Sequence, residues 1–128
     1  MFIDSHCHLD RLDLAEFNQD LSKVVENAHQ ANVSEMLCVS VTLEEFPSMV
    51  EKTKQFPNVW LSCGAHPLNQ DQMIDADNLF SLADHERVVA IGETGLDYFY
   101  APETQAVQQD SFVKHIQVAN KINKPLII

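Results

Sequence analysis

Near its start the chain reads Ile3-Asp4-Ser5-His6-Cys7-His8-Leu9-Asp10, a short apolar strand that ends in two histidines one residue apart. Successive residues of a strand point to opposite faces, so His6 and His8 project to the same side. Two imidazoles at this spacing can bind one metal ion together. The pair alone is a weak indication, because histidines also serve as capped or solvated loop residues. It predicts a metal site only if further ligands gather beside it.

Short apolar runs alternate with segments of helical period along the whole sequence. The runs are Phe2–Ile3, Met36–Val41, Val59–Cys63, Val88–Ile91 and Leu126–Ile128. They are continuously apolar, as expected of a parallel sheet that is covered by helices on both faces. The alternation predicts an α/β fold of four strand-helix units and a fifth strand. This is the N-terminal half, about four and a half units, of a (β/α)8 TIM-type barrel.

Two segments between these runs have helical periodicity. Each places its apolar residues on one expected face, Phe17, Leu21, Val24, Val25 and Ala28 in the first and Phe112, Val113, Ile116 and Ala119 in the second. Pro102 and Glu103 are a start signal for the second helix, and Asn123-Lys124-Pro125 is its stop signal. No linker or low-complexity segment divides the chain, so residues 1–128 are interpreted as a single partial domain.

The composition excludes several classes of protein. The net charge of −11 over 128 residues argues against a protein that coats nucleic acid electrostatically, which needs a basic surface. No apolar run approaches the roughly 20 residues that span a bilayer, and no leader precedes the first run, so neither membrane insertion nor secretion is expected. Three widely spaced cysteines fit neither a disulfide framework nor a zinc knuckle. A cytoplasmic location is therefore predicted.

Polar residues follow the other apolar runs at the positions where barrel enzymes place their chemistry. Gly64-Ala65-His66-Pro67 follows the third run, and Gly92-Glu93-Thr94-Gly95 follows the fourth. The carboxyl ends of parallel strands share one rim, so these loops are expected beside His6 and His8. Glu93 would then supply a carboxylate that binds or bridges divalent ions, and the glycines would allow close backbone approach. A solvated loop glutamate is the alternative.

Three further residues are candidates to contact substrate or to orient the ligands: His66, Asp4 and Asp97. Pro67 favours an extended conformation at His66, which would aim its imidazole at a substrate phosphate or a metal-bound water. A structural hydrogen bond within the loop is the alternative for His66. Asp4 would orient an imidazole, as carboxylates often do beside metal-bound histidines, and Asp10 is as well explained by a cap or turn.

The segment Asp97-Tyr98-Phe99-Tyr100 follows the Glu93 loop. Asp97 could anchor this loop above the site, and the aromatic run offers rings on which a base or sugar could stack. The alternative, expected for at least one ring, is packing on the next helix. The histidines His29, His85 and His115 lie within or at the ends of helical segments, and no catalytic role is assigned to them.

Three motifs together resemble the successive signatures of the TatD-like metal-dependent deoxyribonucleases: Ser5–Asp10, Cys63–Pro67 and Ile91–Tyr98. Their order and spacing match as well, and the resemblance extends from Met1 to Ile128. It implies a (β/α)8 barrel with two divalent metal ions, magnesium, manganese or zinc, that hydrolyses phosphodiester bonds of DNA. Carried over by residue, His6 and His8 would bind one metal, and Glu93 would bridge to the second and be the catalytic carboxylate.

The family's remaining ligands, two histidines and an aspartate on later strands, have no counterpart in these residues. The 128-residue piece is therefore expected to be inactive by itself. Two alternatives to a deoxyribonuclease remain. One is another metal-dependent hydrolase, acting on an ester, a lactone or a cyclic amide. The other is a non-catalytic fragment that associates with a second copy through its open barrel edge at Leu126–Ile128.

Overall fold

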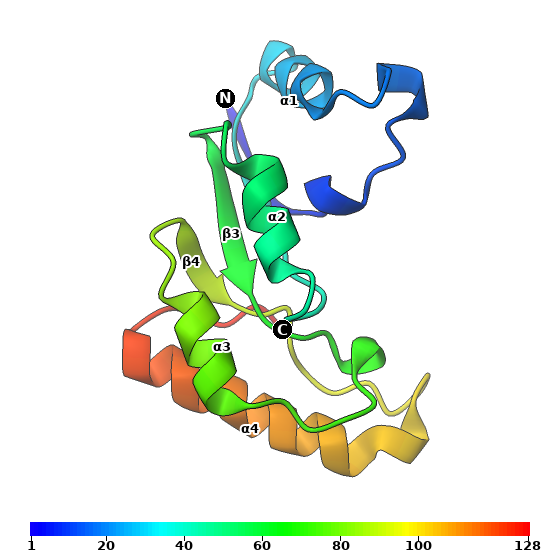
Figure 1. The fold of residues 1–128 in the computed structure, drawn as a ribbon, viewed down its shortest axis with the longest axis vertical. Helices are drawn as coiled ribbons and strands as arrows, with labels where there is room; N and C mark the ends of the chain where they lie inside the picture. Colours follow the sequence, from blue (N-terminus) through cyan, green and yellow to red (C-terminus); the bar gives the residue numbers. More distant parts are fainter.

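The computed structural model describes all residues from 1 to 128, and strands and helices alternate along the chain (Figure 1). The four strands are β1 (Phe2–Cys7), β2 (Val33–Cys38), β3 (Val59–Cys63) and β4 (Val88–Ile91). The four α-helices are α1 (Leu21–Gln30), α2 (Phe46–Thr53), α3 (Ala76–Ala83) and α4 (Gln105–Ile122). Short 3-10 turns lie at Leu9–Arg11, Ala15–Phe17, Pro67–Asn69 and Pro102–Thr104. The predicted alternation of strands and helices is confirmed.

The strands form one parallel sheet in the order β1-β2-β3-β4. Each strand therefore pairs with the strand that precedes it in sequence, as in the winding of a (β/α) barrel. The register joins Met36 to Val59 and Cys63 to Ile91. All four carboxyl ends lie at the same edge of the sheet, so the loops that follow the strands meet there.

Capping residues mark several of the helix ends. Asp20 caps α1 and Asp75 caps α3, each through a carboxylate that accepts from a backbone N–H two residues later. Helix α4 ends where Asn123 adopts a left-handed conformation with φ of 55°, as predicted from Asn123-Lys124-Pro125. These local signals mark the starts of α1 and α3 and the end of α4.

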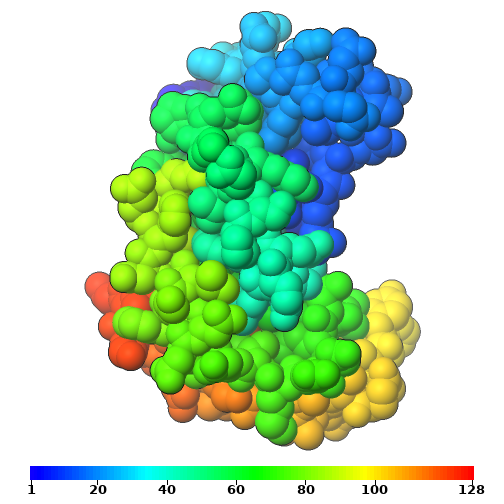
Figure 2. All heavy atoms as spheres, viewed as in Figure 1, coloured from blue at the N-terminus to red at the C-terminus, as the bar shows by residue number.

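The core lies between the sheet and its helices. Helices α2 and α3 pack against β3, and α4, which crosses the bottom of the view, packs against β4 and α3 (Figure 1). Figure 2 shows α2 and α3 side by side on the outer surface in this view. Four of the largest fully buried side chains are Met49, Leu61, Leu79 and Ile91. Burial of each stabilises the fold by about 1.5–3 kcal/mol.

The predicted fifth strand is right in place but wrong in extent. Leu126 forms only an isolated parallel bridge with Ile91. The backbone N–H of Ile91 donates to the carbonyl of Pro125 at 2.8 Å, and that of Ile127 donates to the carbonyl of Ile91 at 2.9 Å. The segment thus lies beside β4 as expected, but the ladder is too short to count as a strand.

Burial on both faces of every strand was also predicted, and this is wrong for β1. Residues Phe2 to His6 are all exposed. Trp60 in β3 and Val89 in β4 also remain 39% and 38% exposed. Trp60 and Val89 point to the face of the sheet that the helices of this chain do not cover, because successive strand residues alternate between faces. β1 is exposed on both faces because it lies at the edge of the sheet and packs mainly against β2.

The predicted apolar face of the last helix is wrong in part. Val113 is 51% exposed, and the side of α4 that faces the protein carries three polar residues, Gln108, Ser111 and His115, beside Val118 and Ala119. Polar side chains can occupy this face because the neighbouring loops offer them hydrogen-bond partners. Phe17, predicted for the first helical face, lies in the preceding 3-10 turn.

Candidate metal centre

The two histidines of the first motif lie side by side at the carboxyl end of β1. His6 is still part of the strand, and His8 follows it directly. Their ring centroids are 5.2 Å apart, with the ring planes at 79°. The predicted convergence of the two imidazoles is therefore present in the structure.

A backbone hydrogen bond fixes the orientation of His8. Its Nδ1 lies 2.9 Å from the carbonyl oxygen of Val39, at the end of β2. A carbonyl can only accept, so Nδ1 carries the proton and Nε2 keeps its lone pair free. Such an outer hydrogen bond is the usual means of aiming a metal-binding imidazole. His8 is thus held in the tautomer that a metal ligand needs.

Glu93 completes the cluster from the loop after β4. Its Oε2 lies 3.4 Å from Nε2 of His6, and its backbone N–H donates to the carbonyl of Ser40 at 3.2 Å. One ligand atom from each of His6, His8 and Glu93 lies within 4.8 Å of the others. Two imidazole nitrogens and a carboxylate oxygen are a donor set that suits zinc, manganese or iron. The three residues can therefore hold one such ion.

Close contact between two loop backbones brings Glu93 into place. A Cβ added at Gly64 would lie 2.5 Å from the Cα of Gly92, and one added at Gly92 would lie 2.5 Å from the carbonyl oxygen of Ile127. Gly92 also has φ of +136°, which other residues rarely adopt. The prediction that glycine allows close backbone approach beside Glu93 is confirmed at Gly92.

Two buried serines tie the strand ends together beneath the cluster. The hydroxyl of Ser62 donates to the carbonyl of Gly92 at 2.6 Å and accepts from the backbone N–H of Ser40 at 3.0 Å. The hydroxyl of Ser40 in turn donates to the carbonyl of Gly64 at 2.9 Å. These bonds connect the ends of β2, β3 and β4. Sequence reasoning missed both serines, because each falls within an apolar run with no motif of its own.

The structure gives His66 features of both alternatives, a ring that faces the cluster and a structural hydrogen bond within its loop. Its Nε2 lies 3.9 Å from Oε1 of Glu93, so the ring faces the cluster. Its Nδ1 accepts a hydrogen bond from the backbone N–H of Leu68 at 3.1 Å, so the ring also caps the turn Pro67–Asn69. The cap leaves Nε2 as the proton-bearing nitrogen, available as a donor toward the site.

The aspartates serve mainly as backbone acceptors. Asp4 accepts from the backbone N–H of His6 at 3.1 Å, so it holds the strand end, whereas the contact that orients an imidazole is made by Val39. Asp97 accepts from the backbone N–H groups of Phe99 and Tyr100 at 3.1 and 2.9 Å. Asp97 therefore shapes the loop beyond Glu93, in keeping with the anchoring role considered for it.

Of the three aromatic residues after Asp97, one packs on α4 and two are exposed. The hydroxyl of Tyr98 accepts from the side-chain amide of Gln109 in α4 at 2.9 Å, so this ring lies on the helix as expected for at least one of the three. Phe99 and Tyr100 remain 84% and 74% exposed, with their ring centroids 4.8 Å apart. These two rings are free to contact another molecule.

The buried glutamine at the start of α4 anchors the same loop. Gln108 accepts from the backbone N–H of Asp97 at 2.7 Å and donates to the carbonyls of Asp97 and Ala101 and to the hydroxyl of Thr104. Sequence reasoning assigned it no role. The signal was the spacing of polar residues 108, 111 and 115, which places them on one helical face.

The cysteines are free and shielded. Cys38 and Cys63 are buried, and Cys7 is partly buried, with its thiol donating to the carbonyl of Leu37. Burial raises the pKa of Cys7, Cys38 and Cys63 to about 12. Neutral thiols are poor metal ligands and poor nucleophiles. No cysteine belongs to the cluster of ligand atoms formed by His6, His8 and Glu93.

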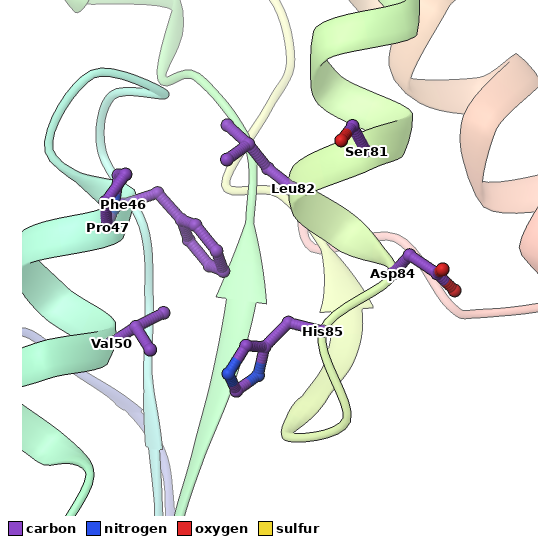
Figure 3. A pocket seen from close by; sticks show the side chains of 7 residues that line it. All are labelled: Phe46, Pro47, Val50, Ser81, Leu82, Asp84 and His85. Atoms are coloured by element: carbon purple, nitrogen blue, oxygen red, sulfur yellow. The ribbon is translucent and has the colours of Figure 1, made fainter.

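A hollow of about 390 Å³ lies elsewhere, between α2 and α3 (Figure 3). Phe46 and Val50 point into it from α2, and His85 faces them from the connection after α3. The rings of Phe46 and His85 meet edge to face with centroids 6.5 Å apart. Its lining contains none of the predicted site residues, so it is separate from the metal centre. No helix has the length and apolar character needed to cross a membrane.

Comparison with known proteins places this geometry in a family. The model of the family described as TatD related DNase matches residues 3–128. The Escherichia coli K12 protein named uncharacterized metal-dependent hydrolase YcfH is 46% identical over 126 residues, which are 98% of this chain and 48% of that protein. The Salmonella typhimurium protein named 3'-5' ssDNA/RNA exonuclease TatD is 30% identical over 119 residues, which are 91% of this chain and 46% of that protein.

A solved structure shows the same fold. The crystal structure of YjjV, a TatD homologue from Escherichia coli K12, superposes with a TM-score of 0.82 at 24% identity and covers 98% of this chain and 49% of that chain. The predicted fold class is confirmed, because the four parallel strands and the helices between them match about half of a related chain. The chain spans about half the length of the curated relatives it matches.

Proposed function

The chain belongs to the TatD-related DNase family. We propose that the full-length protein is a divalent-metal-dependent hydrolase of phosphodiester bonds in DNA, acting as an exonuclease. The observation that carries the proposal is the convergence of His6, His8 and Glu93, whose ligand atoms lie within 4.8 Å of one another. The name of the Salmonella typhimurium relative, a 3'-5' ssDNA/RNA exonuclease, supports a nucleic-acid substrate.

In this proposal His6, His8 and Glu93 are the residues of this chain that would hold the divalent metal. Divalent ions of magnesium, manganese or zinc type would neutralise phosphodiester charge and lower the pKa of a water. The other ligands come from the rest of the protein, because this chain spans about half of its relatives. The residues of this chain supply the frame: Val39 fixes the His8 ring, and the backbone of Ser40 fixes Glu93.

His66 and the exposed aromatics complete the substrate contacts. The Nε2 proton of His66 points to the region of Glu93, where it would donate to a phosphate oxygen. Phe99 and Tyr100 would stack on unpaired bases, which suits single-stranded ends. The net charge of −11 disfavours extensive contact with a duplex backbone, so the proposed substrate is a strand end. We place the enzyme in the cytoplasm, where its three free thiols stay reduced.

The test uses the full-length protein with end-labelled single-stranded oligonucleotides, with and without manganese and with a chelator. Glu93→Gln and His8→Ala should each lower the metal-dependent rate at least about 100-fold. Glu86→Gln is the matched control, because this exposed glutamate makes no hydrogen bond or ion pair. Near-normal turnover by Glu93→Gln would refute the assignment. Hydrolysis of an aryl ester or a cyclic amide in place of DNA would favour a different reaction within the hydrolase class.

For residues 1–128 on their own we propose association with a second copy. Phe2 and Ile3 on β1 are 67% and 66% exposed, and Ile128 is 78% exposed. An apolar strand with an unpaired edge favours pairing with another chain. Light scattering should report a dimer or larger species, and a monodisperse, well-folded monomer would contradict this proposal.

A further inference from the structure

The loop that carries His66 is held at two backbone groups of Ala65 by buried side chains, one from the distant helix α4 and one from Gln70, five residues further along the chain. The N–H of Ala65 donates to Nε2 of His115 in α4 at 3.0 Å. The carbonyl of Ala65 accepts from the side-chain amide of Gln70 at 2.6 Å. Both polar groups of one backbone residue are thus bonded to side chains. Ala65 directly precedes His66, so these bonds set the position of the His66 Cα.

Hydrogen bonds at both ring nitrogens hold His115 beside Ala65. It is fully buried, and its Nδ1 lies 2.7 Å from the carbonyl of Ser111. Because Nε2 accepts from Ala65, Nδ1 carries the proton and donates to Ser111. An apolar side chain of similar size would fill the same volume without the cost of desolvating an imidazole. What the imidazole adds is a directed acceptor for one loop N–H.

Further hydrogen bonds in the loop fix the His66 ring relative to Ala65. The backbone N–H of His66 donates to the carbonyl of Val41 at 2.9 Å, and its carbonyl accepts from Asn69 at 2.9 Å. The ring is then fixed by the bond from Leu68 to its Nδ1, at 3.1 Å, and it faces Glu93 at 3.9 Å. A displacement of Ala65 would therefore move the ring relative to Glu93.

We propose that His115, together with Gln70, is a positioning residue that aims the His66 imidazole at the substrate phosphate beside Glu93. The inference rests on the proposed function, because it assigns the held ring a phosphate to contact. His115 touches neither substrate nor metal ligand and acts only through Ala65. A purely structural role for His115 would stabilise the core without favouring His66 over other parts of the site.

A double-mutant cycle in the full-length protein separates these two roles. His115→Phe keeps an aromatic ring at this position and removes the acceptor. It should lower kcat at least about tenfold with little change in KM, because small misplacements of a catalytic contact are costly. In a His66→Ala background the same substitution should change kcat less than about twofold. An equal loss in both backgrounds, or no loss in the wild type, would overturn the proposal.

Two further variants keep the test decisive. His115→Gln restores an acceptor for the Ala65 N–H and should recover the rate to within about threefold. Gln70→Leu removes the second bond and should show the same dependence on His66, which provides a result if His115→Phe does not fold. Gln117→Ala is the control, an exposed position of α4 without side-chain bonds, and should leave kcat unchanged.

Measurements that need no activity distinguish this inference from the proposed function. If the wild type hydrolyses no oligonucleotide, the proposed function fails, and the ring signals of His66 in NMR spectra of the same variants decide the positioning role. His115→Phe should shift and broaden the His66 signals and remove hydrogen-exchange protection from the Ala65 amide, while His115→Gln retains both. Unchanged His66 signals in His115→Phe would overturn the inference.

Discussion

Replacement of Gly64 by alanine adds a single methyl group at the closest backbone contact of the candidate centre. The new Cβ would lie 2.5 Å from Cα, 2.6 Å from the carbonyl carbon and 2.8 Å from the nitrogen of Gly92. Carbon atoms in contact prefer a separation of about 3.5–4.0 Å, so the ends of β3 and β4 would have to part by about 1 Å. The hydrogen bond from the Gly92 N–H to the Cys63 carbonyl, at 2.8 Å, opposes that movement.

The expected destabilisation follows from this geometry. Extra methyl groups in packed regions cost about 1–3 kcal/mol, and a clash with backbone on a bonded strand pair should reach the upper end, about 3 kcal/mol. In a protein of 150–250 residues that corresponds to a fall in Tm of about 6–12 °C. Because Glu93 follows Gly92, manganese affinity should fall as well.

Thermal unfolding and isothermal titration with manganese in the full-length protein measure both effects. Ser48→Thr, which adds a methyl at an exposed position of α2, is the matched control and should stay within about 0.5 kcal/mol of the wild type. A Gly64→Ala protein with the wild-type Tm and manganese affinity would refute the argument that these strand ends need glycine to meet.

Three further predictions concern buried polar groups. Ser62→Ala leaves two buried backbone groups without their partner and should cost about 2–4 kcal/mol in urea unfolding, and a wild-type midpoint would contradict this. Burial lowers the pKa of His115 below 6.5, so His115 binds a proton more readily in the unfolded than in the folded protein. The stability that comes from keeping His115 neutral is therefore complete above about pH 6.5 and is lost as the pH falls toward the lowered pKa. The urea midpoint should therefore fall more steeply between about pH 7 and 5 in the wild type than in His115→Gln, and parallel curves would refute it. The thiols of Cys7, Cys38 and Cys63, with pKa raised to about 12, should react with iodoacetamide at pH 8 at least about tenfold more slowly in the native than in the unfolded protein, as counted by mass spectrometry.

Local patterns in the sequence were enough to predict the frame of the fold. Apolar runs gave the four strands, and the stop signal at Asn123 gave the end of α4. Boundaries were less accurate, since β1 continues to Cys7 and β2 begins at Val33. Pairing decides these limits, and pairing depends on a neighbouring strand that the local pattern does not contain.

The convergence of the site was predictable because parallel strands end at one edge. His6, His8 and Glu93 were expected together, and the structure brings them together. The residues that hold the site in place through hydrogen bonds were not predicted. Ser62 and His115 act on backbone groups far away in sequence, 30 and 50 residues from their partners Gly92 and Ala65. Such long-range bonds become visible only when the fold places a donor beside an acceptor.

The polar face of α4 shows the same limit. Apolar spacing favoured Val113 as a buried residue, yet the helix buries Gln108, Ser111 and His115. A polar side chain can replace an apolar one in the core when its hydrogen bonds are satisfied, and that condition is set by tertiary structure. Reading polar residues at helical spacing as one face would have identified these three.

Binding of a divalent ion by His6, His8 and Glu93 can be tested by a crystal structure of the full-length protein grown with manganese. We expect an anomalous difference peak within about 2.0–2.3 Å of Nε2 of both histidines and of a Glu93 oxygen, and no such peak in His8→Ala crystals. A manganese-loaded, catalytically active crystal whose anomalous peaks lie away from these three residues would contradict it.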